Sequence, residues 1–213
     1  MMKTTKVCGV ILAAGESSRM GTDKALLPWP PAEQAAAAPF SHTLLSAAIA
    51  ALKPVTDAVI VVAGRNAEKL TPVVSSAGAS LVENPDPDRG QFSSLQTGLS
   101  EVAARGFDVA MITPVDCPPL SASTLERLRT AFEQALASGK WAVAPEHDGR
   151  HGHPLVAGRN LIDAFLSAPV TSNARDVQHG HQQQIEFVPV TEPLLSADLN
   201  TPEQYAAAAR AHS

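Results

Sequence analysis

Three short, continuous apolar runs constrain the fold of this chain more than any other feature. They cover residues 7–13, 57–63 and 108–113, and none of them alternates between polar and apolar residues along its length. Runs of this length and character are typical of strands buried on both faces, as in a parallel sheet covered by helices. Weaker candidates of the same kind follow at 141–144 and 185–190.

Helical periodicity appears between these runs. One apolar stripe is formed by Leu45, Ile49 and Leu52, and another by Leu125, Leu128, Phe132 and Leu136. Strands that alternate with helices predict an α/β fold, with a mostly parallel sheet and helices on both faces. The length of 213 residues fits one such domain over 1–213 and is short for two.

Sequence signals also mark helix starts and loops. Ser123 and Glu126 have the spacing of a capping box, and Thr201 with Gln204 predicts another just before the last helix. The Pro- and Ala-rich stretch 28–39 predicts a surface loop with a short helical turn at 33–38. The polar stretch 146–153 predicts a second loop.

Charge and cysteine content exclude several classes of protein. The net charge is −5 and no segment concentrates Lys or Arg, so neither a nucleic-acid nor a membrane partner is expected. The only cysteines, Cys8 and Cys117, are far apart, which favours a reducing compartment over a disulfide scaffold. With neither a signal peptide nor a membrane-spanning run expected, we predict a cytoplasmic protein.

The loop after the first apolar run is the first candidate site. Ligands of open α/β sheets bind beyond the carboxyl ends of strands, and a Gly/Ser loop can turn its N–H groups toward phosphates. Arg19 and Lys24 can add positive charge there, although a plain connection with exposed cations is the alternative. The loop matches neither a P-loop nor a dinucleotide-binding fingerprint, which argues against P-loop enzymes and typical dehydrogenases. Its nucleotide-binding candidates are Leu12, Ala13, Ala14, Gly15, Arg19 and Lys24.

Asp116 follows the third apolar run and precedes a rigid Pro-Pro turn. A carboxylate at the end of a strand suits Mg²⁺, which prefers one or two carboxylates plus substrate phosphates. The alternative is an aspartate that only caps the turn. Cys117, beside it, is interpreted as a packing residue and not a nucleophile, because no histidine accompanies it in the sequence.

Two further segments carry polar candidates. The stretch 84–99 joins a proline-stiffened loop to a helix start, where free N–H groups and hydroxyls can meet a ligand; its candidates are Asn84, Gly90, Ser93 and Ser94. Asp198 and Asn200 alternate on an extended piece, so either could serve as a second metal ligand or simply organise the helix that follows.

Four histidines raise the question of a zinc site, since they come in two pairs with one residue between the members. These are His151, His153, His179 and His181. They could bind zinc only if two separate loops converged, and a polar loop is the alternative.

Taken in order, five segments resemble the MobA-like nucleotidyltransferase family, and within it the molybdenum cofactor cytidylyltransferases. The segments span Leu12 to Tyr205 and read LAAGESSRMGTDKALLPW, NPDPDRGQFSSLQTGL, PVDCPP, GRHGHPLV and DLNTPEQY. Two departures are Cys117, where many relatives have Met or Gln, and the long 28–39 stretch.

The resemblance implies a Rossmann-like, three-layer fold and Mg²⁺-dependent transfer of a nucleoside monophosphate to a phosphorylated acceptor. Arg19 and Lys24 would hold the triphosphate, and residues 90–94 would face the base. Asp116, with Asn200 and Asp198, would bind Mg²⁺. Residues that would lie toward the acceptor, molybdopterin carrying molybdate, are Gly152, His153 and Pro154.

The resemblance also bears on the nucleotide and on the alternatives. Guanylyl-transferring relatives typically open with Leu-Ala-Gly-Gly, whereas this chain has Ala14 in the third position, which favours CTP. One alternative is a sugar-1-phosphate nucleotidyltransferase. Another is a non-catalytic, nucleotide-binding accessory protein for a molybdoenzyme.

Overall fold

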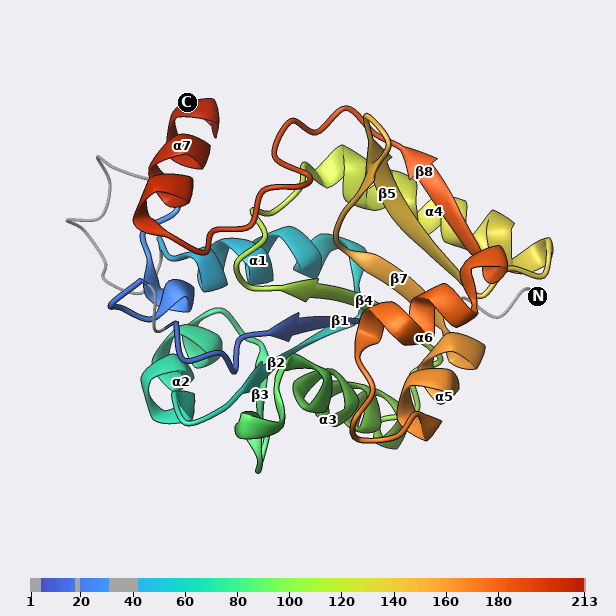
Figure 1. Cartoon of the computed structure of the whole chain (residues 1–213), viewed down its shortest axis with the longest axis horizontal. Coiled ribbons are helices and arrows are strands. Elements are labelled where there is room, and N and C mark those ends of the chain that lie inside the picture. The colour runs from blue at the N-terminus through green and yellow to red at the C-terminus, as the bar shows by residue number, and fades with distance from the viewer. Residues whose placement is uncertain (1–4, 18–19, 31–41, 213) are drawn as a thin grey trace.

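One mixed sheet of eight strands organises the computed structural model, which describes residues 5–17, 20–30 and 42–212 (Figure 1). Its strands are β1 (Val7–Leu12), β2 (Ala58–Ala63), β3 (Ser80–Glu83), β4 (Val109–Pro114), β5 (Ala142–His147), β6 (Arg150–His151), β7 (Leu155–Gly158) and β8 (Ile185–Pro189). They lie in the order β3-β2-β1-β4-β7-β5-β6, and β8 pairs with β5. Strands β1 to β4 are mutually parallel, as are β5 and β8, whereas β7 runs antiparallel to β4 and β5.

Helices cover both faces of this sheet. They are α1 (Leu44–Leu52), α2 (Ala67–Ser76), α3 (Gln91–Ala104), α4 (Ala122–Ala137), α5 (Arg159–Ser167), α6 (Ala174–Gly180) and α7 (Pro202–His212). Helices α1, α2 and α4 pack on the face that carries Ile11 and Met111. Helices α3 and α5 pack on the face that carries Val10 and Ile112, and α6 lies partly buried beside α5. The predicted three-layer α/β fold is therefore confirmed.

All five predicted strands are present. A continuous apolar run is stable where both faces of the strand are buried, as they are in the middle of a covered sheet. The predicted strand at 141–144 extends further, to His147. Strands β3 and β7 and helices α2, α5 and α6 were not predicted. Strand β3 is short and only half-buried, so its pattern is weak.

One predicted helix cap is wrong and the other is confirmed. Helix α4 begins two residues earlier than expected, with Ser121 as the N-cap that accepts a hydrogen bond from the Thr124 N–H at 3.3 Å. Leu136 is 47% exposed, and the buried stripe ends instead at Ala135. At α7, the Gln204 N–H donates to Thr201 Oγ1 at 3.3 Å and the Thr201 N–H donates to Gln204 Oε1 at 3.1 Å, as a capping box requires.

The predicted loop at 146–153 is largely a hairpin, so that prediction is wrong. Strand β5 continues to His147, and β6 pairs with it through Glu146 and His151. Asp148 and Gly149 both have positive φ, at 50° and 74°. A two-residue turn with both φ values positive matches the twist of the strands, and Asp-Gly is well suited to it.

Of the stretch 28–39, only residues 28–30 are described, and the helical turn predicted at 33–38 lies outside the described residues. Trp29 is buried against Leu44, Leu199 and Ala208, which joins this region to α7. No helix within 5–17, 20–30 and 42–212 is both long and apolar enough to cross a membrane.

The strand register brings three loops together. Leu12 at the end of β1 pairs with Val62 in β2 and with Pro114 in β4. The loops that begin at residues 13, 64 and 115 therefore leave the same edge of the sheet side by side. This is the edge at which open α/β sheets bind their ligands.

Candidate active site

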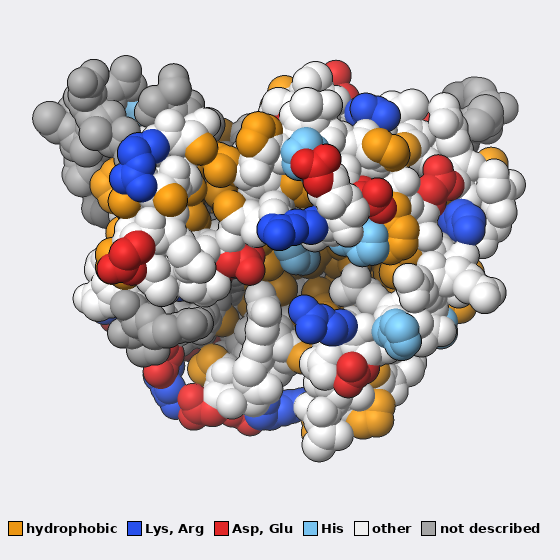
Figure 2. All heavy atoms as spheres, turned by 45° about the horizontal axis from the view of Figure 1, so that its top comes forward, with side chains coloured by type: hydrophobic (Ala, Val, Ile, Leu, Met, Phe, Trp, Pro, Cys, Tyr) orange, Lys and Arg blue, Asp and Glu red, His pale blue; other side chains and the backbone are white. Residues whose placement is uncertain are grey.

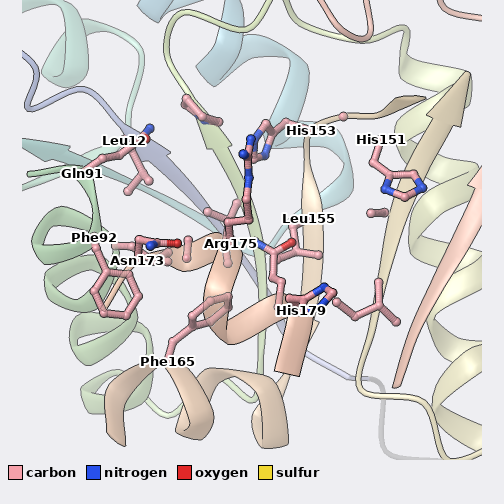
Figure 3. A pocket seen from close by; sticks show the side chains of 18 of the residues that line it. Leu12, Gln91, Phe92, His151, His153, Leu155, Phe165, Asn173, Arg175 and His179 are labelled. Atoms are coloured by element: carbon pink, nitrogen blue, oxygen red, sulfur yellow. The ribbon is translucent and has the colours of Figure 1, made fainter. Parts of the chain in front are cut away.

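Two adjoining pockets lie at this edge of the sheet. The smaller, of about 410 Å³, is lined by residues 12–17 and by parts of the loops around Lys24, Gly90 and Asp116. The larger, of about 960 Å³, lies between α3, α6 and the β5–β7 region (Figure 3). Leu12, Gly90 and Gln91 line both pockets, so a group bound at this boundary is accessible from either side.

Lys24 joins two segments of the site that are distant in the sequence. Its Nζ lies 3.0 Å from Oδ2 of Asp116 and donates a hydrogen bond to Oδ1 of Asn200 at 2.6 Å. The side chains of Lys24 and Asp116 are only 13% and 24% exposed. The structure thus places these three predicted site residues in one cluster at the smaller pocket.

Short-range hydrogen bonds position the loop that carries Lys24. The Lys24 N–H donates to Ser17 Oγ at 3.0 Å, and Asp23 Oδ1 accepts from the Ala25 N–H at 3.0 Å. Asn66 donates both to the Ala13 carbonyl at 2.9 Å and to Asp23 Oδ2 at 2.7 Å. The two ends of the loop are therefore tied together. The predicted phosphate-binding residue Arg19 lies outside the described residues.

The backbone of the segment 198–200 is held next to Asp116. The Leu199 N–H donates to the Asp116 carbonyl at 3.0 Å. Asn200 then reaches Lys24, whereas Asp198 Oδ1 accepts from Cys117 Sγ at 3.7 Å. Of the two predicted second metal ligands, Asn200 is the one that shares a partner with Asp116.

The environment of Cys117 disfavours a thiolate. Burial, together with the nearby carboxylates of Asp116 and Asp198, raises the pKa of this thiol well above its usual value. A thiol that stays protonated is a poor nucleophile. The geometry therefore agrees with the interpretation of Cys117 as a packing residue.

The loop before α3 is organised from behind by Asn84. This buried side chain donates to Ser93 Oγ at 2.8 Å and to Ser94 Oγ at 3.0 Å, and its Oδ1 accepts from the Asp86 N–H. Gly90 and Ser94 line the smaller pocket. Neither Asn84 nor Ser93 lines either pocket, so both are placed to support the wall and not to form it.

Gly152 and His153 line the larger pocket, whereas the adjoining Pro154 does not. Burial lowers the pKa of His153, against the opposing effects of a backbone hydrogen bond with Ile112 and the charges of Asp198 and Asp116. The Nδ1 atom of His153 is buried without a hydrogen-bond partner among the described residues. A neutral imidazole with an unsatisfied buried nitrogen leaves a polar position for a ligand to fill.

The four histidines do not assemble into a zinc site. His151 stacks on Phe187 at 3.7 Å between ring centroids, while His181 lies against Trp141 at 4.9 Å. In the parts of the chain that the structure describes, no three His, Cys, Asp or Glu side chains are grouped to hold a metal ion. Any metal at Asp116 would therefore need ligands from the substrate as well.

The loop after β2 contains site residues that the sequence analysis missed. A Cβ at Gly64 would lie 2.9 Å from the Ala14 carbonyl oxygen, so only glycine lets the two loops meet this closely. Arg65 forms ion pairs with Glu16 Oε1 and Asp88 Oδ2, each at 2.5 Å, and both of these carboxylates line the smaller pocket. Gly64 and Arg65 directly follow the apolar run 57–63, and this position could have identified them as candidates, as it did for Asp116.

Comparisons with protein families and with known proteins identify relatives of this chain. The family model of the MobA-like NTP transferase domain matches residues 9–185. A probable molybdenum cofactor guanylyltransferase from Mycobacterium avium (strain 104) is 32% identical and covers all of both chains. A molybdenum cofactor cytidylyltransferase from Escherichia coli (strain K12) is 24% identical over 92% of each chain.

Solved structures agree in fold. Rv0371c from Mycobacterium tuberculosis H37Rv superimposes with a TM-score of 0.78 at 22% identity, covering 98% of this chain and 100% of that one. A second structure of Rv0371c, described as a complex with manganese, has a TM-score of 0.73 at 20% identity, covering 97% of this chain and 99% of that one. Because the family model matches most of its length, the chain belongs to the MobA-like NTP transferase family.

Proposed function

We propose that this nucleotidyltransferase moves a cytidylyl group from CTP to the phosphate of a molybdopterin-type acceptor and releases pyrophosphate. The observation that carries the proposal is the cluster of Lys24, Asp116 and Asn200 at the smaller pocket, which adjoins a second, larger pocket. A transferase that joins two substrates directly needs two adjacent sites and a charged group where they meet.

The smaller pocket is the proposed nucleotide site. Backbone N–H groups of the 12–17 loop and the ammonium of Lys24 would hold the triphosphate, with Arg19 from the same loop. Gly90 and Ser94 would face the base, and Asn84 with Ser93 would hold that wall in place. Gly152 and His153 in the larger pocket would lie toward the acceptor, with Pro154 as their support.

The reaction needs no general base. An oxygen of the acceptor phosphate attacks the α-phosphorus of the nucleotide, and the bond between the α-phosphorus and the bridging oxygen breaks as pyrophosphate leaves. The attacking oxygen is already anionic, so catalysis consists of positioning and charge stabilisation. The ammonium of Lys24 would stabilise the negative charge that develops on the leaving pyrophosphate.

The residues at the site fit Mg²⁺. Asp116 and Asn200 offer a carboxylate and an amide oxygen, which are hard ligands of the kind that Mg²⁺ takes together with substrate phosphates. Asp198 is linked to the same segment as Asp116 by a hydrogen bond from the Cys117 thiol. When bound, the ion would offset the charge of the phosphates. The manganese complex of Rv0371c supports a divalent ion in this fold.

Ala14 supports CTP as the preferred nucleotide. It lines the smaller pocket, where a glycine would give the backbone more freedom to approach a larger purine base. A single methyl group discriminates by about 10- to 200-fold at most, so the wall at 90–94 must contribute. Because the Mycobacterium avium relative is named a guanylyltransferase, GTP is the competitor to test.

The proposal is tested by pyrophosphate release from each of the four NTPs, with a molybdopterin-type acceptor and with a sugar 1-phosphate. We expect turnover with CTP and the molybdopterin-type acceptor, and an increased share of GTP turnover in Ala14→Gly. A preference for GTP in the unchanged protein would reject the cytidylyl assignment alone. A preference for the sugar phosphate would reject the acceptor, and NTP binding without pyrophosphate release would indicate an accessory protein.

The cellular setting forms part of the proposal. The product would be a nucleotide form of the cofactor for a molybdoenzyme in the cytoplasm.

A further inference from the structure

The larger pocket has a charge pattern unlike the rest of the chain. Asp and Glu outnumber Lys and Arg by 21 to 16 overall. Nevertheless, none of the described residues that line this pocket is acidic, while three arginines and three histidines line it. They are Arg89, Arg150, Arg175, His151, His153 and His179. Figure 2 shows a hollow with hydrophobic side chains inside it, and Lys or Arg, His and a few Asp or Glu side chains around it.

Arg175, on α6, is one of the three arginines that line this pocket. Figure 3 shows Leu12 and Gln91 at one side of the pocket and His179 at the other, with Arg175 reaching in between them. The neighbouring carboxylate of Asp176 is engaged by Asn173 Nδ2 at 2.7 Å. The Arg175 guanidinium has no ion-pair partner among the described residues. It is therefore available for a bidentate contact with an anionic group.

The interior of the pocket suits a flat ring. Phe92, Phe165 and Phe187 line it, and His151 stacks on Phe187 with an angle of 9° between the ring planes. The buried, unpartnered Nδ1 of His153 is an independent sign that a polar ligand atom belongs there. A volume of about 960 Å³ is within the range of sites for small molecules.

We propose that Arg175 is a specificity-determining residue that binds an anionic group of the acceptor in the larger pocket. The inference rests on the proposed function for the identification of the ligand as the acceptor. It goes beyond that function by assigning to the choice of acceptor a residue on α6 that lies outside the five quoted sequence segments but inside the span of the family model. The contact would form in the larger pocket while the nucleotide occupies the smaller one.

Flavin mononucleotide is a suitable probe, since it combines a fused flat ring with one phosphate and its fluorescence reports stacking. Its binding to the full chain is titrated by fluorescence quenching, with and without saturating CTP. Riboflavin, which lacks the phosphate, tests the need for charge. The variants are Arg175→Gln, Arg175→Lys and, as a matched control, Arg127→Gln, whose exposed side chain lines neither pocket.

We expect flavin mononucleotide to bind in the presence of CTP and riboflavin to bind more weakly. Arg175→Gln should weaken flavin mononucleotide by about three- to tenfold, a range that allows for the exposure of the guanidinium. Arg175→Lys should be intermediate because it keeps the charge and loses the planar fork. Arg127→Gln should match the unchanged protein.

The inference is overturned if Arg175→Gln binds flavin mononucleotide normally, if riboflavin binds equally well, if CTP displaces the probe, or if the unchanged protein does not bind it. A separate calorimetric titration with CTP keeps the two proposals apart. If the unchanged protein does not bind CTP but binds flavin mononucleotide in a way that depends on Arg175, the proposed function is rejected. The larger pocket would then still be a site for anionic ring compounds. Normal CTP binding by Arg175→Gln would show that the variant is folded.

Discussion

The ammonium of Lys24 lies 3.0 Å from a carboxylate oxygen of Asp116, and Asn200 Oδ1 accepts from the same ammonium at 2.6 Å. A cation thus already sits between the two oxygen ligands that we propose for the metal. Both side chains of the ion pair are mostly buried, so the attraction is screened less than on the surface. This relationship leads to predictions for each partner.

Replacing Lys24 with alanine should lower kcat by about 100-fold and raise the KM for the nucleotide. The reason is that negative charge grows on the leaving pyrophosphate, so the ammonium interacts more strongly in the transition state than in the ground state. Steady-state pyrophosphate release measures both constants, with Lys69→Ala on the exposed face of α2 as the control. An effect on KM alone would make Lys24 a binding residue only.

Replacing Asp116 with asparagine should keep the fold and remove most of the metal-dependent activity, by about 100-fold or more. The backbone carbonyl of Asp116, which accepts from the Leu199 N–H, is unaffected by the change. Activity is measured over a range of Mg²⁺ concentrations, and circular dichroism checks the fold. Asp108→Asn, an exposed carboxylate before the same strand, is the matched control. Full turnover at saturating Mg²⁺ would contradict the assignment.

Arg65 should tune the affinity for the nucleotide through electrostatics. It neutralises Glu16 and Asp88, which line the smaller pocket, so Arg65→Ala would leave two uncompensated carboxylates facing the triphosphate. We expect a two- to fivefold rise in the nucleotide KM that shrinks as salt is added, because these groups are exposed. Arg159→Ala, which breaks the exposed pair with Asp163, is the control and should leave this KM unchanged.

Neither cysteine should react in the folded protein. Burial raises the pKa of Cys8 to about 12, and burial with two carboxylates raises the pKa of Cys117 well above its usual value. The thiol forms should therefore persist through pH 8, and a chromogenic disulfide reagent should detect thiols only after unfolding. Cys117→Ser should retain substantial activity. A nucleotidyl group trapped on Cys117 would refute direct transfer.

Gly98, on α3, should tolerate no side chain. A Cβ there would lie 2.8 Å from Val62 Cγ2 and 2.9 Å from Val10 Cγ1, between the helix and the sheet. Gly98→Ala should therefore lower the free energy of unfolding by about 1–3 kcal/mol. Gly180→Ala, also at a helical position but with open space around it, should not destabilise the protein. Chemical denaturation of both variants measures the difference, and equal stabilities would show that α3 can move away.

Local patterns in the sequence were enough to predict the architecture and one edge of the site. Buried strands must be apolar on both faces, so β1, β2 and β4 were visible as runs, and their ends pointed to Asp116 and the 12–24 loop. Predictions that rest on only a few adjacent residues, such as a helix cap, were wrong where contacts with distant parts of the chain changed the local structure. The N-cap of α4 moved to Ser121, because Ser121 and Thr124 both donate to Glu192 from a distant part of the chain.

The sequence by itself determined the family, the layered fold and the residue types available for the chemistry. Only the tertiary structure decided which of them meet: Asn200 reaches Lys24 across 176 positions, whereas Asp198 turns to Cys117. It also brought Arg175 into a pocket with residues of α3 and β7, although nothing in its local sequence indicates a site. The physical reason is that periodicity and strand ends are short-range properties of the chain, while contacts between side chains depend on sheet register and helix packing.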